Sequence, residues 1–249
     1  MTTFPFYPPD RARDCERYAV EYKFDQEEPT PWTPLRRDLR RCRAAVVTTA
    51  GIRLKTQHMF APSSADFREI SIYVSPEDVA FDFTQYDPGE AEKDLNVLVP
   101  VEPLRELVDR GVLGGLHETF FSFFGPCADL AGLRASARRA GERLRDGGVD
   151  VALVVPANTQ CNQTAGLIAR ELERLGLSTL CAVTIKEIAL QVRLPRAVFI
   201  NFPFGRTLGR AGDRPLQDSI VSDMVRALRT LDRPGKVIDL PYRWSGMVA

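Results

Sequence analysis

Short apolar runs alternate with longer amphipathic segments along the second half of the chain. Valine-rich runs of four to seven residues predict buried strands, and apolar residues at helical spacing predict helices between them. The predicted strands are 149–155, 178–183, 197–201 and 236–240, and the predicted helices are 162–175, 185–192 and 215–231. Such alternation requires crossover connections, which are right-handed, so the sequence predicts an α/β fold with a doubly wound, mostly parallel sheet.

The first half of the chain is expected to form a second α/β lobe, with a cleft between the two lobes. Strands are predicted at 44–49 and 67–74 and helices at 103–110 and 128–146, and the phenylalanines of 116–124 are expected in the core. Residues 1–40 are rich in proline, charge and aromatics, which predicts an extended arm packed on the body. The expected division is an arm at 1–40, a first lobe at 41–147 and a second lobe at 148–249.

Charge and composition exclude several classes of partner. Acidic and basic residues balance at 33 each, so neither a nucleic acid nor an anionic membrane is indicated as a partner. No apolar run approaches the ~20 residues of a membrane span, and the N-terminus lacks the features of a secretory signal. Five cysteines without a C-x-x-C pair predict a cytoplasmic protein with reduced thiols.

Neither a metal nor an organic cofactor is expected. The chain has only two histidines, which disfavours a zinc site of the usual Cys/His type. No G-x-G-x-x-G motif follows a predicted strand, so the dinucleotide-binding fingerprint is absent from the sequence.

The loop after the strand 149–155 is the predicted centre of the chemistry. In open α/β folds, ligands bind at the carboxyl ends of the strands, and Cys161 lies in this loop next to a predicted helix start. Unpaired backbone N–H groups and the helix dipole favour a thiolate at such a position. Cys161 is therefore the candidate nucleophile or acid/base, with a buried structural role as the alternative.

Neutral polar residues surround this candidate in unusual density. Helix capping needs only one or two of them, so the remainder is expected to bind a substrate carboxylate or amide. The expected substrate-binding residues are Thr48, Thr49, Gly51, Gln160, Asn162, Thr164, Phe204 and Gly205. His117 is a further candidate acid or base, with an imidazole bonded to a backbone carbonyl as the structural alternative.

Motifs spread over most of the chain resemble the selenoprotein B family of the glycine, sarcosine, betaine and D-proline reductases. Their order and spacing carry the resemblance. They include Pro31-Trp32-Thr33-Pro34, Val46-Val47-Thr48-Thr49-Ala50-Gly51, Tyr86-Asp87, Asp94-Leu95-Asn96-Val97, Ser122-Phe123-Phe124-Gly125, Cys161-Asn162-Gln163-Thr164, Phe202-Pro203-Phe204-Gly205 and Pro241-Tyr242-Arg243-Trp244.

The resemblance implies a reductase subunit that works with a partner subunit bearing a pyruvoyl group. In the family, a selenocysteine or cysteine three residues before the position of Cys161 attacks an activated carbon and expels an amine, and the nearby thiol resolves the adduct. This chain has Asn158 at that catalytic position, and Phe83 where relatives often carry a histidine. Both departures predict altered chemistry.

Three hypotheses remain open at this point. The first is a divergent reductase-family enzyme acting on a small amino acid or amine-containing metabolite through Cys161. The second is a non-catalytic substrate-binding or partner subunit of a reductase-like complex. The third rests on Cys-Asn-x-Thr, which resembles cofactor-independent racemases with two opposed cysteines, with Cys127 as the second thiol. A homo-oligomer is compatible with each.

Overall fold

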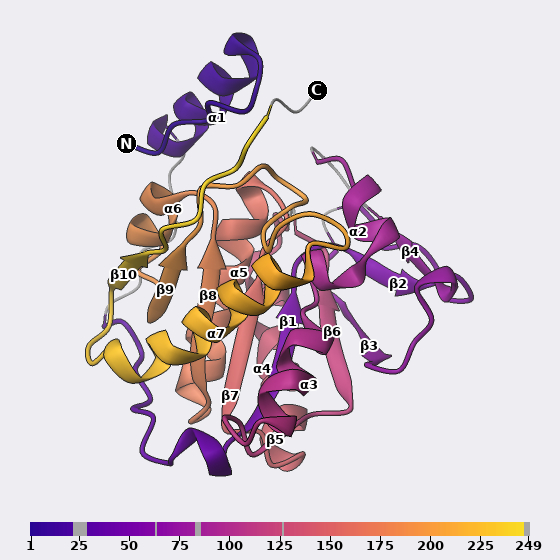
Figure 1. The fold of residues 1–249 in the computed structure, drawn as a ribbon, viewed down its shortest axis with the longest axis vertical. Coiled ribbons are helices and arrows are strands. Elements are labelled where there is room, and N and C mark those ends of the chain that lie inside the picture. Colours follow the sequence, from indigo (N-terminus) through magenta and orange to yellow (C-terminus); the bar gives the residue numbers. More distant parts are fainter. Residues whose placement is uncertain (22–28, 63, 83–85, 126, 247–249) are drawn as a thin grey trace.

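A single large sheet forms the centre of the molecule (Figure 1). The structure, a computed structural model, describes residues 1–21, 29–62, 64–82, 86–125 and 127–246. The strand order is β10-β9-β8-β7-β1-β6-β3, with β5 beside β1, and every pairing is parallel except that of β3 with β6. The strands are β1 (Arg43–Thr48), β3 (Phe67–Ser71), β5 (Gly115–Leu116), β6 (Thr119–Phe123), β7 (Val151–Val155), β8 (Ser178–Val183), β9 (Arg196–Phe199) and β10 (Lys236–Asp239). The predicted α/β class with a mostly parallel sheet is confirmed.

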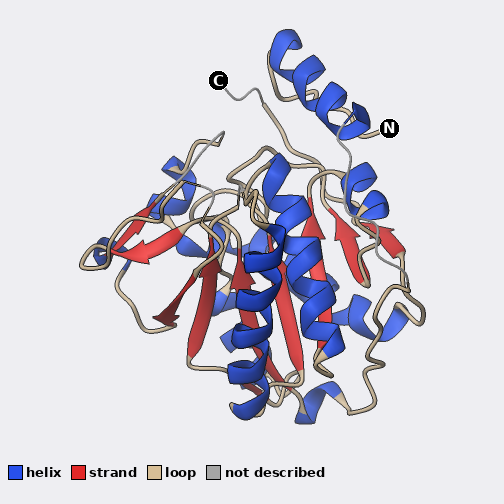
Figure 2. Cartoon of the chain, turned by 180° about the vertical axis from the view of Figure 1, so that it is seen from behind, coloured by secondary structure: helices blue, strands red, loops and turns tan. Residues whose placement is uncertain are grey.

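Helices cover both faces of this sheet. Figure 2 shows α4 (Leu130–Asp146) and α5 (Thr159–Arg174) on one face, and Figure 1 shows α3 (Val101–Asp109) and α7 (Arg214–Thr230) on the other. The shorter α6 (Lys186–Gln191) connects β8 to β9. Because both faces are covered, β7 and β8 are buried along their whole lengths, which is why β7 is a continuous apolar run and β8 is apolar after Ser178 and Thr179.

The strands of the two predicted lobes join in one sheet. β1 and β7 pair over five residues, from Ala44 opposite Val151 to Thr48 opposite Val155. The expected boundary at residue 147 therefore lies between two neighbouring strands, and their buried side chains belong to one apolar cluster. This differs from the expected pair of lobes, because β1 is apolar on both faces and pairs with the equally apolar β7.

The first half adds a small antiparallel pair beside the main sheet. It consists of β2 (Ile52–Leu54) and β4 (Val79–Phe81), and α2 (Gly89–Lys93) follows it. Short 3-10 turns lie at Leu39–Arg41, Pro76–Asp78 and Leu95–Val97. The loops from these elements reach the carboxyl edge of the main sheet.

The expectation of an extended N-terminal arm is wrong for residues 9–21, which form α1 (Pro9–Glu21). Cys15 and Ala19 are buried and lie one helical turn apart, and Asp10–Arg13 and Asp14–Arg17 form ion pairs along the helix. This i, i+4 pattern was present in the sequence but is short. In Figure 1, α1 lies above the carboxyl edge of the sheet, and it packs against α5 and α6.

Residues 29–38 are anchored at the opposite, amino edge of the sheet. There, Arg196 and Glu173 form a fully buried ion pair with an N–O distance of 2.5 Å, and the Arg196 guanidinium stacks 3.5 Å above the Trp32 ring. The carbonyl of Thr33 accepts a hydrogen bond from Arg196, and its N–H donates one to Glu173. The tryptophan motif is thus a structural clamp.

Candidate functional site

The N-terminus of α5 lies at the carboxyl edge of the sheet, directly after β7. Asn158 is the N-cap residue, because its backbone is extended and its side-chain oxygen accepts a hydrogen bond from the Cys161 N–H at 2.8 Å. Asparagine is among the best residues for this position. The helix therefore begins at Thr159, three residues earlier than predicted, and Cys161 lies in its first turn.

The thiol of Cys161 is enclosed rather than exposed. The residue is 1 % exposed, and its Sγ donates a hydrogen bond to the carbonyl oxygen of Thr49 at 3.1 Å. Burial raises the pKa of Cys161 to about 11, although hydrogen bonds with the Ala157 backbone, with Thr49 and with the backbone at Asn158 and Cys161 act in the opposite direction. This contrasts with the expectation of an accessible thiolate, because desolvation outweighs the effect of the helix start.

Most of the polar side chains expected to bind substrate are used within the fold. Thr48 donates to the Val155 carbonyl and Thr49 to the Cys161 carbonyl, so both link β1 to the β7–α5 connection. Asn162 bonds to Asn158 and to both the N–H and the hydroxyl of Thr184. Thr164 donates to the carbonyl of Gly125, and Gly51 bonds through its backbone to Phe123 and Asp82. Their density reflects loops joined tightly at one sheet edge.

Two of the residues expected to bind substrate differ from the others: Gln160 is partly exposed, and Phe204 lines a cavity. The Gln160 side chain is half-buried, and within the described residues it has no hydrogen-bond partner. Phe204 lines a cavity of about 440 Å³ together with Thr159 and, from α1, Arg11, Asp14, Cys15 and Tyr18. The cavity is therefore roofed by α1 and floored by the first turn of α5.

An aromatic cluster closes one side of this region. Phe4 and Tyr7 pack on Phe204 with ring centroids 5.9 and 5.5 Å apart, and the Tyr7 hydroxyl accepts a hydrogen bond from the Phe204 N–H at 2.7 Å. The N–H of the next residue, Gly205, donates to the Ala157 carbonyl at 2.7 Å. The N-terminal segment and the loop after β9 thus meet over the start of α5.

Sequence reasoning missed two close contacts at this edge. A Cβ on Gly125 would collide with Cys161 Sγ, so the backbone after β6 presses directly on the thiol. Gly205 has φ +78°, and a Cβ there would collide with the Asp87 carbonyl. Both glycines stood in motifs that carried the family resemblance, which was the available signal. The phenol of Tyr86, also missed, is buried beside them and donates to the Ala50 carbonyl at 2.6 Å.

His117 lies at the other edge of the sheet. The backbone N–H of His117 donates to the carbonyl of Ala44, at the beginning of β1. Thr49, by contrast, follows the end of that strand. The Nδ1 atom of His117 lies 2.9 Å from the Thr119 carbonyl oxygen, which fits the structural alternative. The structure does not bring His117 together with Cys161.

Phe83 and Cys127 are the remaining sequence candidates. Phe83 lies outside the described residues. Cys127 Sγ is 3.3 Å from the Asp129 carbonyl oxygen, whereas the described contacts of Cys161 Sγ are with Thr49 and Gly125. None of the five cysteines, all of which the structure describes, is in a disulfide. In the described ranges, no group of three or more His, Cys, Asp or Glu is placed to hold a metal ion, and no helix is both long and apolar enough to cross a bilayer.

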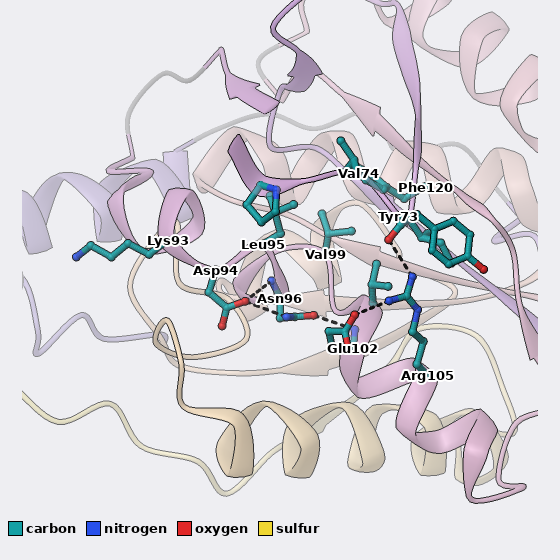
Figure 3. A pocket seen from close by; sticks show the side chains of 13 residues that line it. Tyr73, Val74, Lys93, Asp94, Leu95, Asn96, Val99, Glu102, Arg105 and Phe120 are labelled. Carbon is teal, nitrogen blue, oxygen red and sulfur yellow. Dashed lines mark hydrogen bonds and ion pairs between the residues drawn. The ribbon is translucent and has the colours of Figure 1, made fainter. Parts of the chain in front are cut away.

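A separate cavity of about 330 Å³ lies between α3, the turn at 95–97 and the end of β3 (Figure 3). Its floor is apolar, and the polar groups at its rim mostly bond to one another. Asp94 accepts two hydrogen bonds from Asn96, and Arg105 pairs with Glu102 and stacks on Tyr73. In the close-up, Lys93 points away from the other labelled side chains. This cavity has no candidate nucleophile.

Comparisons with known proteins identify related subunits. D-proline reductase subunit gamma of Acetoanaerobium sticklandii is 28 % identical over 222 residues, which cover 88 % of this chain and 92 % of that protein. The glycine reductase complex component B subunit gamma of Symbiobacterium thermophilum is 29 % identical over 225 residues, 86 % of this chain and 52 % of that protein. The chain thus spans nearly all of the first relative and about half of the second. No solved structure matches.

The family comparison extends this result over the first part of the chain. Residues 13–157, more than half of the sequence, match the family described as glycine/sarcosine/betaine reductase selenoprotein B. The match ends at Ala157, next to the N-cap residue Asn158. The predicted resemblance is confirmed, and the chain belongs to the glycine/sarcosine/betaine reductase selenoprotein B family.

Proposed function

We propose that this chain is a subunit of a reductase-like complex that binds a small amino acid or amine-containing metabolite and does not supply the family's nucleophile. The relatives are named as subunits of D-proline, glycine and sarcosine reductases, which supports the role of a subunit. The cavity beneath α1 is the proposed substrate site. A pyruvoyl-bearing partner and a cytoplasmic location belong to the same proposal.

The observation that carries the proposal is the pair of residues at the start of α5. Asn158 stands where the family pattern has a selenocysteine or cysteine, and its side chain is committed to capping the helix. The thiol behind it is buried and has a pKa of about 11, so at neutral pH only about one molecule in ten thousand carries a thiolate. Neither residue is thus prepared to attack a carbon.

A second candidate is the divergent enzyme that uses Cys161 itself. The polar surroundings of Cys161 favour it, since its Sγ donates to the Thr49 carbonyl and its backbone N–H donates to the side chain of the N-cap residue Asn158. In this case the thiol must become exposed and ionised when substrate or the partner subunit binds.

Reconstitution with the pyruvoyl-bearing partner subunit separates the two candidates. The assay follows primary-amine formation by ring opening of D-proline, or ammonia release from glycine, with dithiothreitol as reductant, alongside calorimetric binding of the same amino acids. A binding subunit predicts that Cys161→Ser leaves binding unchanged and that the wild-type complex has no thiol-dependent turnover. Turnover that is lost in Cys161→Ser would instead establish the enzyme. Absence of any association with the partner subunit would reject the subunit role itself.

A further inference from the structure

Arg206 is a nearly buried arginine whose donors are mostly unused. Its side chain is 11 % exposed, and among the described residues its single side-chain partner is Asp87, at 2.8 Å through Nη2. A guanidinium has five N–H donors, and the bond to Asp87 uses one of them. None of its nitrogens is both buried and unpartnered within the described residues, so its remaining donors reach solvent, where an incoming acceptor can bind them.

Arg53, in β2, shows how a structural arginine is satisfied in this fold. Its exposure is similar, at 14 %, but it donates to both oxygens of Asp82 and to the carbonyls of Leu54 and Gln57. Its partner Asp82 is 6 % exposed, whereas Asp87 is 55 % exposed. The Arg206–Asp87 pair is thus open to an incoming molecule on the carboxylate side.

The pair lies beside the start of α5. The backbone of Gly205 presses on the Asp87 carbonyl and donates to Ala157, and Thr207 donates to the Pro156 carbonyl. Arg206 is thus held between two residues fixed to the β7–α5 connection. Phe204, two positions before it, lines the cavity beneath α1.

The charge of Arg206 also acts on Tyr7, a residue of the aromatic cluster beside the cavity. Burial raises the pKa of Tyr7 to about 12, and the positive charges of Arg11 and Arg206 oppose that rise. The hydroxyl of Tyr7 accepts a hydrogen bond from the Phe204 N–H, so Arg206 lies close enough to influence a residue of the aromatic cluster that borders the cavity.

We propose that Arg206 and Asp87 form a two-point recognition pair, in which Arg206 binds the carboxylate and Asp87 the ammonium group of one zwitterionic amino acid. This inference rests on the proposed function and assigns the residues that determine its specificity. The planar guanidinium pairs with a carboxylate through two parallel hydrogen bonds. Asp87, already ionised and exposed, holds a cation at the distance set by its pairing with Arg206.

Three probes that differ only in their charged groups test the pair by calorimetry on the full chain. They are D-proline, cyclopentanecarboxylate, which lacks the amine, and pyrrolidine, which lacks the carboxylate. The wild type is expected to bind D-proline about tenfold or more tightly than either analogue. Arg206→Gln removes the preference for D-proline over pyrrolidine, and Asp87→Asn removes the preference for D-proline over cyclopentanecarboxylate.

Arg53→Gln is the matched control, because it disturbs an arginine of similar burial outside the pair. Its binding of D-proline is expected to stay within about twofold of the wild type, with folding of every variant checked by circular dichroism. Arg206→Lys, which keeps the charge but loses the fork, is expected to retain only part of the affinity. Wild-type binding of D-proline in Arg206→Gln, or no preference for the zwitterion in the wild type, overturns the pair. Assembly with the partner subunit would survive that result, so failure of the pair and failure of the subunit role are distinguishable.

Discussion

The thiol of Cys161 donates a hydrogen bond to the carbonyl oxygen of Thr49 at 3.1 Å and so joins the first turn of α5 to the end of β1. The Thr49 hydroxyl returns a bond to the Cys161 carbonyl. Two strands and one helix thus converge on a sulfur that is hidden from solvent, and its ionisation is the most direct quantity to measure.

Alkylation should find Cys161 nearly inert at neutral pH. Its pKa of about 11 predicts that the rate of iodoacetamide labelling rises tenfold per pH unit from pH 7 to about 10. Peptide mass spectrometry resolves each cysteine, and half-buried Cys127 is the internal reference. Rapid labelling of Cys161 at pH 7 that levels off near pH 8 would show a thiolate and favour the enzyme.

Asn158→Cys should create a reactive thiol where the wild type has none. The new sulfur would lie at the N-cap, where the backbone N–H of Cys161 and the helix dipole stabilise a thiolate, so its pKa should fall below the ordinary value of about 8.5. Loss of the amide cap should cost about 1 kcal/mol of stability. The measurements are labelling against pH and urea unfolding. Asn158→Ser keeps a capping side chain without a thiol and should label as the wild type does.

Gly125→Ala should be destabilising because its methyl group would meet Cys161 Sγ and the Thr49 carbonyl oxygen. Overpacking of this kind costs about 1–3 kcal/mol in the free energy of unfolding. Gly115→Ala is the control, since the nearest atom to its Cβ would lie 3.9 Å away. The double variant Gly125→Ala/Cys161→Ala should recover part of the loss in urea unfolding. Equal stability of Gly125→Ala and the wild type would contradict the described contact.

Glu173→Gln should be among the most destabilising single substitutions. It leaves the buried Arg196 guanidinium without its carboxylate and also weakens the bonds to Thr179 and Thr33. Breaking one side of a buried ion pair costs about 3–5 kcal/mol. Glu142→Gln, which removes an exposed ion pair with Arg138, should change the unfolding free energy by less than about 0.5 kcal/mol. Comparable effects of the two variants would mean that the Arg196–Glu173 pair contributes little to the free energy of unfolding.

The stability contributed by Asp94 should disappear in acid. Burial acts to raise its pKa, but hydrogen bonds from Gln217, Gly212 and Asn96 outweigh burial and lower it. A depressed carboxyl pKa contributes stability above the unfolded value of about 3.9, and that contribution is lost as pH falls through the folded value. Asp94→Asn should therefore be less stable than the wild type by about 1–2 kcal/mol at pH 6. The difference should narrow below about pH 4 in urea titrations. Asp109→Asn, at an exposed position, is the control.

The regular elements of the second half followed directly from sequence pattern, because parallel strands covered on both faces are continuous apolar runs. β8 was predicted at its observed bounds, and α7 and β10 within one residue at each end. Helix α1 was missed because its buried stripe is short and lies among prolines and charges. The join of β1 to β7 is a long-range pairing, which no local pattern encodes.

The position of the candidate loop could be predicted from the sequence, but the burial and the ionisation of its groups could not, and its role in binding or catalysis stays a prediction. The loop at Asn158–Cys161 does lie at the carboxyl edge of the sheet. Exposure depends on distant residues such as Gly125 and Phe204, which close over the thiol, and so the lowered pKa expected of Cys161 was wrong. The threonine and asparagine side chains bond to neighbouring segments of the fold, and their role in substrate binding stays a prediction.

The N-terminal region is fastened at two independent places, by Tyr7 at the carboxyl edge and by Thr33 at the amino edge. Cleavage of the chain after residue 21 would thus remove α1, which covers the cavity, whereas the contacts of Thr33 at the amino edge of the sheet would remain. The truncated chain would expose the start of α5 to a neighbouring subunit. It would keep the stability contributed by the contacts of Thr33 with Arg196 and Glu173.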